Sequence, residues 1–312
     1  MNIAILSGVD LDFGGGGQRP AHLYRAYNKL GHHKCNYYNG FKIKTWDIDF
    51  NKFDLIILEY PFKQASEQLK HYNGKIIYEI LDDWAELGSL AYDKKVEKKV
   101  IALADLTTAV SKKLAKDYKC IYSPNAVDLD LYDSLDVPAI KPNDPTNLIV
   151  GYVGHLRGWW FDWEIIKRLS EQKNIEVHIV GEYDVYRFTA PNVFYHGKKS
   201  YEKIPGYVKS FDVGIIPFKK GKLFDKVSPL KAYEYIAANV PIVSMYSLEQ
   251  IKLPDLHYAD DIDYFVDLVN SYKNIKEGWV IKDIEEKNKK KRDFIEMNTW
   301  KHRATFLLEA LE

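Results

Sequence analysis

The sequence is poor in cysteine and contains no long apolar run. Its 312 residues include two cysteines, Cys35 and Cys120, which are far apart and match no metal-ligand spacing. Two such residues cannot form a zinc site alone and argue against a disulfide framework, so we expect a cytoplasmic protein. No run of 18 apolar residues occurs, and no segment is expected to span a membrane. The N-terminus enters a strand-like run without a basic stretch, which argues against a signal peptide.

The sequence also lacks an excess of charge of either sign. Lys plus Arg number 44 and Asp plus Glu number 44, so the formal net charge is zero. This balance argues against a general electrostatic grip on nucleic acid, although a local basic patch remains compatible with it. Aromatic residues are abundant, at 14% of the chain with 23 Tyr and 7 Trp. Such rings can stack on sugars or bases, and most are expected in the core.

Short apolar runs alternate with helical stretches, and a chain of this length suggests about two domains. The strand-like runs lie at residues 3–6, 53–58, 75–81 and 106–110, and again at 148–153, 176–180, 193–195, 213–217 and 242–244. Helical periodicity lies between them at residues 19–30, 94–104, 112–118, 163–172, 204–210 and 230–238. Continuous apolar strands between helices are typical of parallel sheets covered on both faces. We expect an α/β protein made of two doubly wound halves in tandem.

Two segments lie outside this pattern. Residues 137–145 hold three prolines and predict an interdomain linker. Residues 283–311 are expected to be helical, with a basic run at residues 288–292 followed by an apolar face. That face carries Trp300, Phe306, Leu307 and Leu311. The basic run is interpreted as a solvated helix surface, with contact to anionic lipid or to an acidic substrate as the alternative.

Four consecutive glycines, at residues 14–17, follow the first predicted strand. They suggest a backbone that approaches a phosphate or a sugar closely, in front of a helix N-terminus that favours anions. A mobile surface loop is the alternative. The dinucleotide fingerprint G-x-G-x-x-G fails here, because its last position is Arg19. A nicotinamide enzyme is therefore disfavoured.

Asp82 and Asp83 follow the third apolar run of the first half. Open α/β sheets place ligands at the carboxyl ends of their strands, so one of these carboxylates could take a proton from a hydroxyl. Capping of a helix that starts near Trp84 is the alternative, and the two roles can be divided between the pair.

In the second half, two turns carry further candidates. Gly154, His155 and Arg157 follow a strand, where the two cationic side chains could meet a diphosphate. A structural role for His155 is the alternative.

The second of these turns leads into the helix at residues 230–238. Ser228 is predicted to cap it and Pro229 to lie in its first turn, followed by Leu230 and Lys231. The free N–H groups of such a helix start would bind an anion, and Glu234 could accept hydrogen bonds from ribose hydroxyls. The alternative is an ordinary amphipathic helix with Lys231 and Glu234 on its surface.

Four Asp-x-Asp strings could bind Mg²⁺ or Mn²⁺ together with a nucleotide sugar. They start at Asp10, Asp47, Asp128 and Asp261. We interpret them as caps and turns, so no metal site is predicted.

Taken in order, these motifs resemble those of GT-B-fold glycosyltransferases of the family 4 type. The likeness is greatest to the subgroup with teichuronic-acid and related cell-surface polysaccharide transferases. The residues that carry it are 14–17, 104–105, 110–111, 114, 124–128, 151–154, 161–162, 180–181, 192–193, 197, 212–218, 228–238, 241–244, 298–300 and 303. Together they extend over nearly the whole chain.

The resemblance implies two Rossmann-like domains that face each other across a cleft. It places an acceptor domain at residues 1–140, a donor domain at 146–290, and at 291–312 a C-terminal helix that packs back on the first domain. The donor would be a nucleotide-diphosphate sugar, with UDP, GDP and dTDP not distinguished, and no further cofactor is implied. The acceptor would be a hydroxyl of a glycan or a lipid-linked glycan. A peripheral contact with the inner face of the membrane is compatible with this, and nucleic acid is a disfavoured partner.

The resemblance also assigns roles to individual residues. Glu234 falls on the second glutamate of the family's E-x7-E motif, which contacts the donor ribose, whereas Lys226 stands where the first glutamate is expected. His155 takes the place of a phosphate-binding arginine. The acceptor-side residue maps to Asp82, with Asp83 beside it.

We therefore expect a retaining, metal-independent glycosyltransferase in which Lys231, Arg157 and the helix start at Ser228 stabilise the leaving diphosphate. The backbone of Gly15 and Gly16 would help in this. The alternatives are a nucleotide-sugar epimerase with this fold, a non-catalytic nucleotide-sugar-binding subunit, and a transferase that acts on modified nucleic acid.

Overall fold

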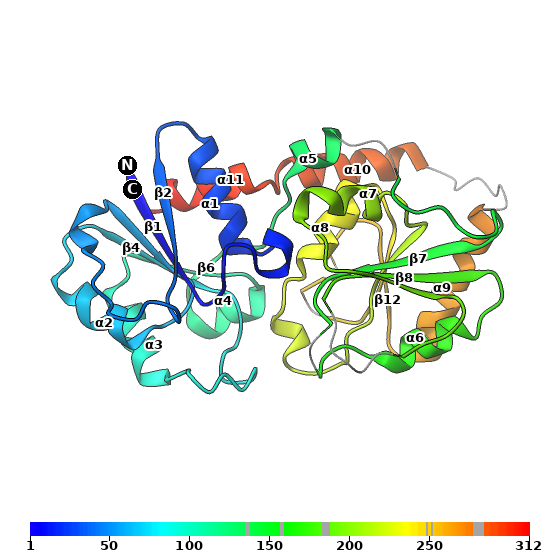
Figure 1. The fold of residues 1–312 in the computed structure, drawn as a ribbon, viewed down its shortest axis with the longest axis horizontal. Helices are drawn as coiled ribbons and strands as arrows, with labels where there is room; N and C mark the ends of the chain where they lie inside the picture. Colours follow the sequence, from blue (N-terminus) through cyan, green and yellow to red (C-terminus); the bar gives the residue numbers. More distant parts are fainter. Residues whose placement is uncertain (135–137, 157–158, 183–187, 248, 251, 277–283) are drawn as a thin grey trace. The chain divides into compact units, whose positions relative to one another are not determined.

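The chain folds into two units, each with its own parallel sheet, in the computed structural model (Figure 1). Unit 1 comprises Met1–Asn125, Lys226–Ser228 and Trp300–Glu312, and unit 2 comprises Ala126–Asp225 and Pro229–Thr299. The structure describes residues 1–134, 138–156, 159–182, 188–247, 249–250, 252–276 and 284–312. Unit 1 is thus assembled from three separate stretches of the sequence.

Unit 1 is built on a six-stranded parallel sheet. In sheet order its strands are β2 (Lys34–Asn39), β1 (Asn2–Ser7), β3 (Leu55–Leu58), β4 (Lys75–Ile80), β5 (Leu106–Ala109) and β6 (Ile121–Tyr122). The four apolar runs of the first half correctly predict the four central strands. The edge strands β2 and β6 have no such signal, because β2 mixes polar and aromatic residues and β6 is two residues long.

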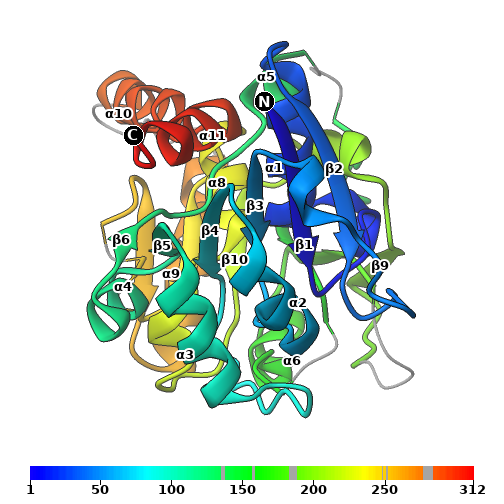
Figure 2. The same ribbon diagram turned by 90° about the vertical axis from the view of Figure 1, so that its left-hand side faces the viewer.

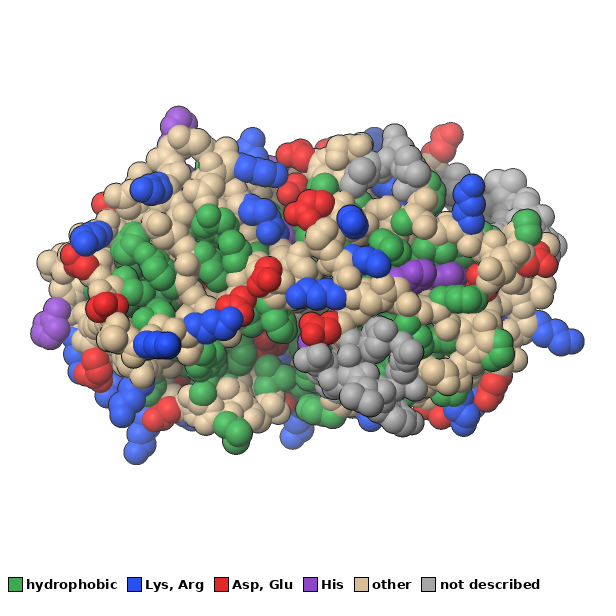
Figure 3. All heavy atoms as spheres, viewed as in Figure 1, with side chains coloured by type: hydrophobic (Ala, Val, Ile, Leu, Met, Phe, Trp, Pro, Cys, Tyr) green, Lys and Arg blue, Asp and Glu red, His purple; other side chains and the backbone are tan. Residues whose placement is uncertain are grey.

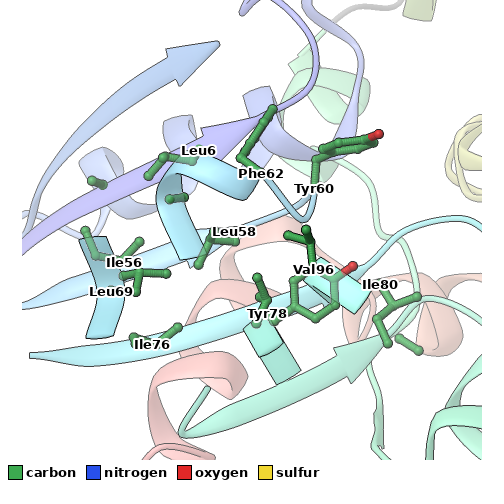
Figure 4. Close-up of a cluster of buried hydrophobic side chains, with 14 of the residues drawn as sticks. Leu6, Ile56, Leu58, Tyr60, Phe62, Leu69, Ile76, Tyr78, Ile80 and Val96 are labelled. Carbon is green, nitrogen blue, oxygen red and sulfur yellow. The ribbon is translucent and has the colours of Figure 1, made fainter. Parts of the chain in front are cut away.

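Helices cover both faces of this sheet (Figures 1 and 2). One face packs under α2 (Lys63–Gln68), α3 (Lys94–Leu103) and α4 (Lys112–Tyr118). The side chains between them form a continuous apolar core, part of which Figure 4 shows around Leu58 and Tyr78. The other face packs under α1 (Arg19–Lys29), and α11 (Trp300–Glu309) lies beside α1. The helix α11 therefore belongs to unit 1, whereas residues 291–299, which the resemblance also places on the first domain, belong to unit 2.

A buried ion pair joins α1 to the sheet. Nη2 of Arg19 lies 2.6 Å from Oε1 of Glu79 in β4, and both side chains are almost completely buried. The same guanidinium donates to the hydroxyl of Ser123 and to the carbonyl of Pro124, each at 2.9 Å. It also lies over the ring of Trp300, 5.7 Å from the ring centroid. One arginine thus connects a helix, a strand, a loop and the C-terminal helix.

Unit 2 repeats the architecture with a second six-stranded parallel sheet. In sheet order its strands are β12 (Leu256–Ala259), β11 (Ile242–Met245), β10 (Val213–Ile216), β7 (Leu148–Val153), β8 (Ile175–Val180) and β9 (Val193–Gly197). Its helices are α5 (Leu129–Ser134), α6 (Trp163–Ser170), α7 (Ile204–Val208), α8 (Leu230–Ala237), α9 (Ile262–Lys276) and α10 (Ile284–Glu296). The 3₁₀ turns of the chain are η1 (Phe13–Gly16), η2 (Phe50–Lys52), η3 (Leu69–His71), η4 (Tyr201–Lys203) and η5 (Phe224–Lys226).

The proline-rich segment packs on unit 2. The amide of Ala139 donates to the carbonyl of Gly206 at 2.9 Å, and the amide of Ile140 donates to Oγ of Ser210 at 2.9 Å. The side chain of Ile140 is buried. The division between the units instead follows Asn125. Prolines indicate an irregular backbone, but they do not show whether that backbone is a free linker or packs against one of the units.

The helical tail is two helices, because residues 297–299 interrupt it between α10 and α11. The basic run at residues 288–292 is not simply a solvated surface. Lys291 is 4% exposed, and its Nζ lies 2.8 Å from Asp255. Arg292 forms an ion pair with Asp133, also at 2.8 Å. The expectation of a wholly solvated run is therefore wrong for Lys291.

Among the described helices, none is both long enough and apolar enough to cross a membrane.

Glu59 provides a test of the electrostatics beneath α1. It follows β3 directly and is 1% exposed, and neither of its carboxyl oxygens has a hydrogen-bond partner among the described residues. Burial and the neighbouring Glu79 raise the pKa of Glu59 well above its usual range, against the opposing charge of Arg19. The pKa of Glu59 is higher in the folded state than in the unfolded state, so folding favours its protonated form. The free energy of unfolding therefore falls as the pH rises from the unfolded-state pKa to the folded-state pKa.

We therefore expect Glu59→Gln to increase the free energy of unfolding at pH 8 and to leave it nearly unchanged at pH 4, measured by urea denaturation. The amide cannot ionise, so the variant escapes the cost that rises with pH. Glu79→Gln is the matched control, and it should destabilise the protein by about 3–5 kcal/mol because it leaves Arg19 unpaired in the core. A difference between Glu59→Gln and the wild type that does not vary with pH would contradict the assignment.

Candidate functional site

The start of α8 in unit 2 carries most of the predicted donor residues. The helix begins at Leu230, with Pro229 in the N-cap position and no side-chain hydrogen bond to the cap. The prediction that Ser228 caps the helix and that Pro229 lies inside it is therefore wrong by one residue. Proline has no amide hydrogen, and its ring fixes a backbone angle suited to a helix start. The first-turn amides of α8 consequently have no capping side chain and can receive a ligand.

Glu234 is a buried carboxylate on this helix, and the half-buried Lys231 acts on it electrostatically. No hydrogen bond or ion pair of the described residues satisfies the carboxylate of Glu234, which is 6% exposed. Burial raises the pKa of Glu234 to about 7, and Lys231 opposes this. Burial lowers the pKa of Lys231 to about 8, with Glu234 opposing. Two titratable groups with shifted pKa values near the start of one helix are a recognised feature of functional sites.

Two aromatic rings hold the ammonium of Lys231. Its Nζ lies 5.1 Å from the ring centroid of Tyr152 in β7 and 4.7 Å from that of Phe218, which follows β10. Such cation–π contacts partly replace the solvation that burial removes. Neither ring is predicted from the sequence as part of the site, although both lie within the motifs that carry the resemblance.

Two glycines at adjacent strand ends bring the backbone close to this lysine. Gly154 follows β7 with φ +148° and Gly181 follows β8 with φ +154°. A Cβ at Gly181 would lie 1.8 Å from the carbonyl oxygen of Gly154, and a Cβ at Gly154 would lie 3.0 Å from Cε of Lys231. Only glycine fits such an approach. Gly154 therefore lies beside Lys231, and Gly181 packs against Gly154.

His155 follows Gly154 and is half-buried. Its carbonyl accepts a hydrogen bond of 3.1 Å from the hydroxyl of Tyr152, which joins the turn to the rings around Lys231. Arg157, the second predicted cation of this turn, lies outside the described residues.

The glycine loop of unit 1 forms η1, a short 3₁₀ turn between β1 and α1. Gly15 and Gly16 have φ angles of 78° and 84°. The carbonyl of Gly16 accepts a hydrogen bond of 2.6 Å from Nη2 of Arg25 in α1. This backbone is therefore fixed by α1, which differs from the alternative of a freely mobile loop.

The structure gives Asp82 and Asp83, which follow β4 in unit 1, different surroundings. Asp83 forms a 2.6 Å ion pair with Lys226, and it accepts a hydrogen bond of 3.0 Å from the amide of Glu86. Asp82 has no hydrogen bond or ion pair in the described part of the chain. Burial, together with the charge of Asp83, raises the pKa of Asp82 to about 7. Asp83 caps a turn, not a helix, and Asp82 is the carboxyl group that remains available.

No group of three or more His, Cys, Asp or Glu side chains suited to a metal ion occurs among the described residues. Two of the Asp-x-Asp strings supply local contacts: Asp49 accepts a hydrogen bond from the backbone amide of Asn51, and Asp261 accepts one from the backbone amide of Tyr264. These two contacts agree with the interpretation as caps and turns. Asp10 instead accepts a hydrogen bond from the side-chain amide of Asn39, which is distant in the sequence.

No protein-family model matches the chain. It is 23% identical over 207 residues to TuaH of Bacillus subtilis (strain 168), which carries the provisional name of a teichuronic acid biosynthesis glycosyltransferase. That match covers 58% of this chain and 51% of TuaH, so the chain spans about half the length of this curated relative.

Solved structures resemble the chain over its whole length. Sucrose-phosphate synthase from Thermosynechococcus elongatus has a TM-score of 0.69 at 14% identity, covering 99% of this chain and 98% of that one. Anabaena HepE in complex with UDP has a TM-score of 0.64 at 14% identity, covering 100% and 99%. The chain therefore resembles GT-B glycosyltransferases and has the GT-B fold, with two Rossmann-like units.

Proposed function

We propose that the chain is a glycosyltransferase that transfers a sugar from a nucleoside-diphosphate sugar to a hydroxyl group. The observation that carries the proposal is the start of α8, where uncapped amides and Lys231 lie together with the carboxylate of Glu234, to which no described residue donates a hydrogen bond. The amides and the ammonium can bind a diphosphate, and the carboxylate can accept hydrogen bonds from a ribose. The likeness to HepE, whose structure holds UDP, supports a nucleotide of this kind.

Lys231 and the helix start would stabilise the leaving diphosphate. Negative charge builds on this group as the glycosidic bond breaks, and fixed cations and dipoles in a dry site stabilise such charge best. The rings of Tyr152 and Phe218 keep the ammonium in place without neutralising it. Gly154 lets the backbone reach the phosphates, and His155 lies in the same turn. Arg157 and the loop of Gly15 and Gly16 are proposed as further contacts.

Glu234 would accept hydrogen bonds from the two ribose hydroxyls. A buried carboxylate is costly unless it is paired, and the bound nucleotide would supply the missing partners. The site would then hold the donor without a metal ion, because Lys231 and the helix dipole supply the positive charge. A retaining outcome is part of the proposal.

Asp82 would orient the acceptor hydroxyl or take its proton, since Asp83 is already engaged by Lys226. In a front-face reaction the departing phosphate oxygen could take the proton, and Asp82 would then only orient the acceptor. We propose a glycan or lipid-linked glycan as acceptor, with a peripheral location at the inner membrane face. Figure 3 shows positive and negative side chains interspersed over the face in view, which argues against a broad nucleic-acid surface there.

The proposal is tested by a thermal-shift panel of UDP, GDP, dTDP, ADP and CMP with their sugars, with and without EDTA. A ligand at 100 times its Kd should add about 2.7 kcal/mol to the free energy of unfolding. We expect one nucleoside diphosphate to stabilise the protein equally in EDTA. Binding that EDTA abolishes and Mn²⁺ restores would contradict the metal-independent site. Product analysis with the donor alone separates a transferase from an epimerase, and donor hydrolysis separates it from a silent binding subunit.

Substitution of Glu234 and substitution of Lys231 should have different effects on ligand affinity. Glu234→Ala should weaken the binding of both the nucleoside and its diphosphate at least about tenfold, because a charged hydrogen bond is worth roughly 1.5–3 kcal/mol. Lys231→Met should weaken the diphosphate alone, because it removes the phosphate contact and keeps the side-chain volume. Titration calorimetry with uridine and UDP measures both. If the two variants changed the two affinities in parallel, these separate roles would be wrong.

Asp82→Asn should lower turnover by about 10²- to 10⁴-fold, as the loss of general-base assistance does, with unchanged donor affinity. The pKa of about 7 predicts that wild-type turnover rises with pH through neutrality, since the base must be ionised. This acidic limb should disappear in the variant. Asp93→Asn is the matched control, because it removes a charge from the same loop while Asn still caps α3. If Asp82→Asn kept full turnover, Asp82 would not be the base, and the donor phosphate would activate the acceptor hydroxyl instead.

A further inference from the structure

Lys226 is anchored in unit 1 by two carboxylates. Its Nζ lies 2.6 Å from Oδ2 of Asp83 and 3.1 Å from Oε1 of Glu86. The side chains of Lys226 and Asp83 are 13% and 16% exposed, so water and salt screen this pair less than an exposed one. Asp83 is itself fixed, because its other oxygen accepts the amide of Glu86. The ammonium is thus held by a short turn that starts one residue after Asp82.

A second contact holds the same segment two residues further on. Nδ2 of Asn125 donates to the carbonyl of Ser228 at 2.6 Å. Asn125 is buried, and its Oδ1 accepts a bond of 3.3 Å from Arg19, which is already paired with Glu79. Residues 226–228 are therefore held at both ends by contacts within unit 1. Ser228 continues through one peptide bond into Pro229, the N-cap of α8.

Among the residues that the structure describes, the charged groups that act on Lys226 are acidic. Asp82, Asp83 and Glu86 lie on the turn, and Tyr92 and Tyr118 carry hydroxyls that donate to Glu97 behind it. Asp83 acts electrostatically on Asp82 and on both tyrosines. Lys226 is the cation that offsets this negative cluster. Its removal would leave Asp83 unpaired next to Asp82, which makes ionisation of Asp82 harder.

We propose that Lys226 is a positioning residue: its ion pair with Asp83 fixes the segment that leads into the donor-binding start of α8. The inference rests on the proposed function and explains why a lysine stands where the resemblance predicts a glutamate. Two of the three hydrogens of the ammonium are directed to carboxylates, so the side chain acts through the backbone of residues 226–229 and not on the sugar.

The anchoring is tested without any ligand by amide hydrogen exchange. Lys226→Met and Asp83→Asn should each speed exchange at residues 226–234 by about tenfold, the equivalent of one charge-assisted hydrogen bond. The double variant should be no worse than either single one, since both remove the same pair. Lys226→Arg should restore slow exchange. Lys75→Met is the matched control, because it removes an exposed pair with Asp105 elsewhere in unit 1.

The functional consequence is measured on the same proteins. Lys226→Met should weaken UDP binding about tenfold and move the acidic limb of turnover to higher pH, whereas Lys75→Met should change neither. Unchanged exchange in Lys226→Met overturns the inference. Faster exchange with unchanged UDP affinity also overturns it, because the pair would then be structural only. Failure of the wild type to bind any nucleoside diphosphate overturns the proposed function instead, and the exchange data alone then decide whether Lys226 orders the helix start.

Discussion

The buried pair between Arg19 and Glu79 is the interaction on which unit 1 depends. Burying an arginine is tolerable only if its donors are satisfied, and Glu79, Ser123 and Pro124 satisfy them. These partners come from a strand and from the loop where the first stretch of unit 1 ends. The arginine also orders Asn125, which holds the segment before α8. Arg19 is therefore connected through Asn125 to the backbone of Ser228, which precedes the candidate donor site.

The same principle operates in unit 2 with the opposite outcome. Around Arg19 the charge is paired by several hydrogen bonds. At the start of α8, no described residue forms a hydrogen bond with the buried carboxylate of Glu234, and two ring faces lie around the ammonium of Lys231. Buried charged groups whose hydrogen bonds are all made form a structural cluster. Buried charged groups that lack hydrogen bonds are typical of a site that binds a ligand. We base the functional proposal on this contrast.

The sequence predicts the central strands of both sheets because continuous apolar runs have no other stable place than a sheet covered on both faces. It does not predict β2, whose alternating polar residues suit an edge, nor the break at residues 297–299, which depends on packing. Candidate residues at strand ends, such as Asp82 and Gly154, follow from the rule that ligands lie at carboxyl ends. The roles of Lys226 and Asn125 could not be predicted, because their partners are far away in the sequence and only the folded chain brings them together.

The position of Trp300 has a consequence for how the protein is made. Its ring stacks on His22 of α1, with centroids 4.7 Å apart, and lies against Arg19. Unit 1 is therefore incomplete until residues 300–312 have been synthesised. The surface of α1 that α11 covers stays exposed to solvent while the residues of unit 2 that precede α11 are made. Damage to α11 should therefore destabilise the N-terminal half of the chain, although α1 and α11 lie far apart in the sequence.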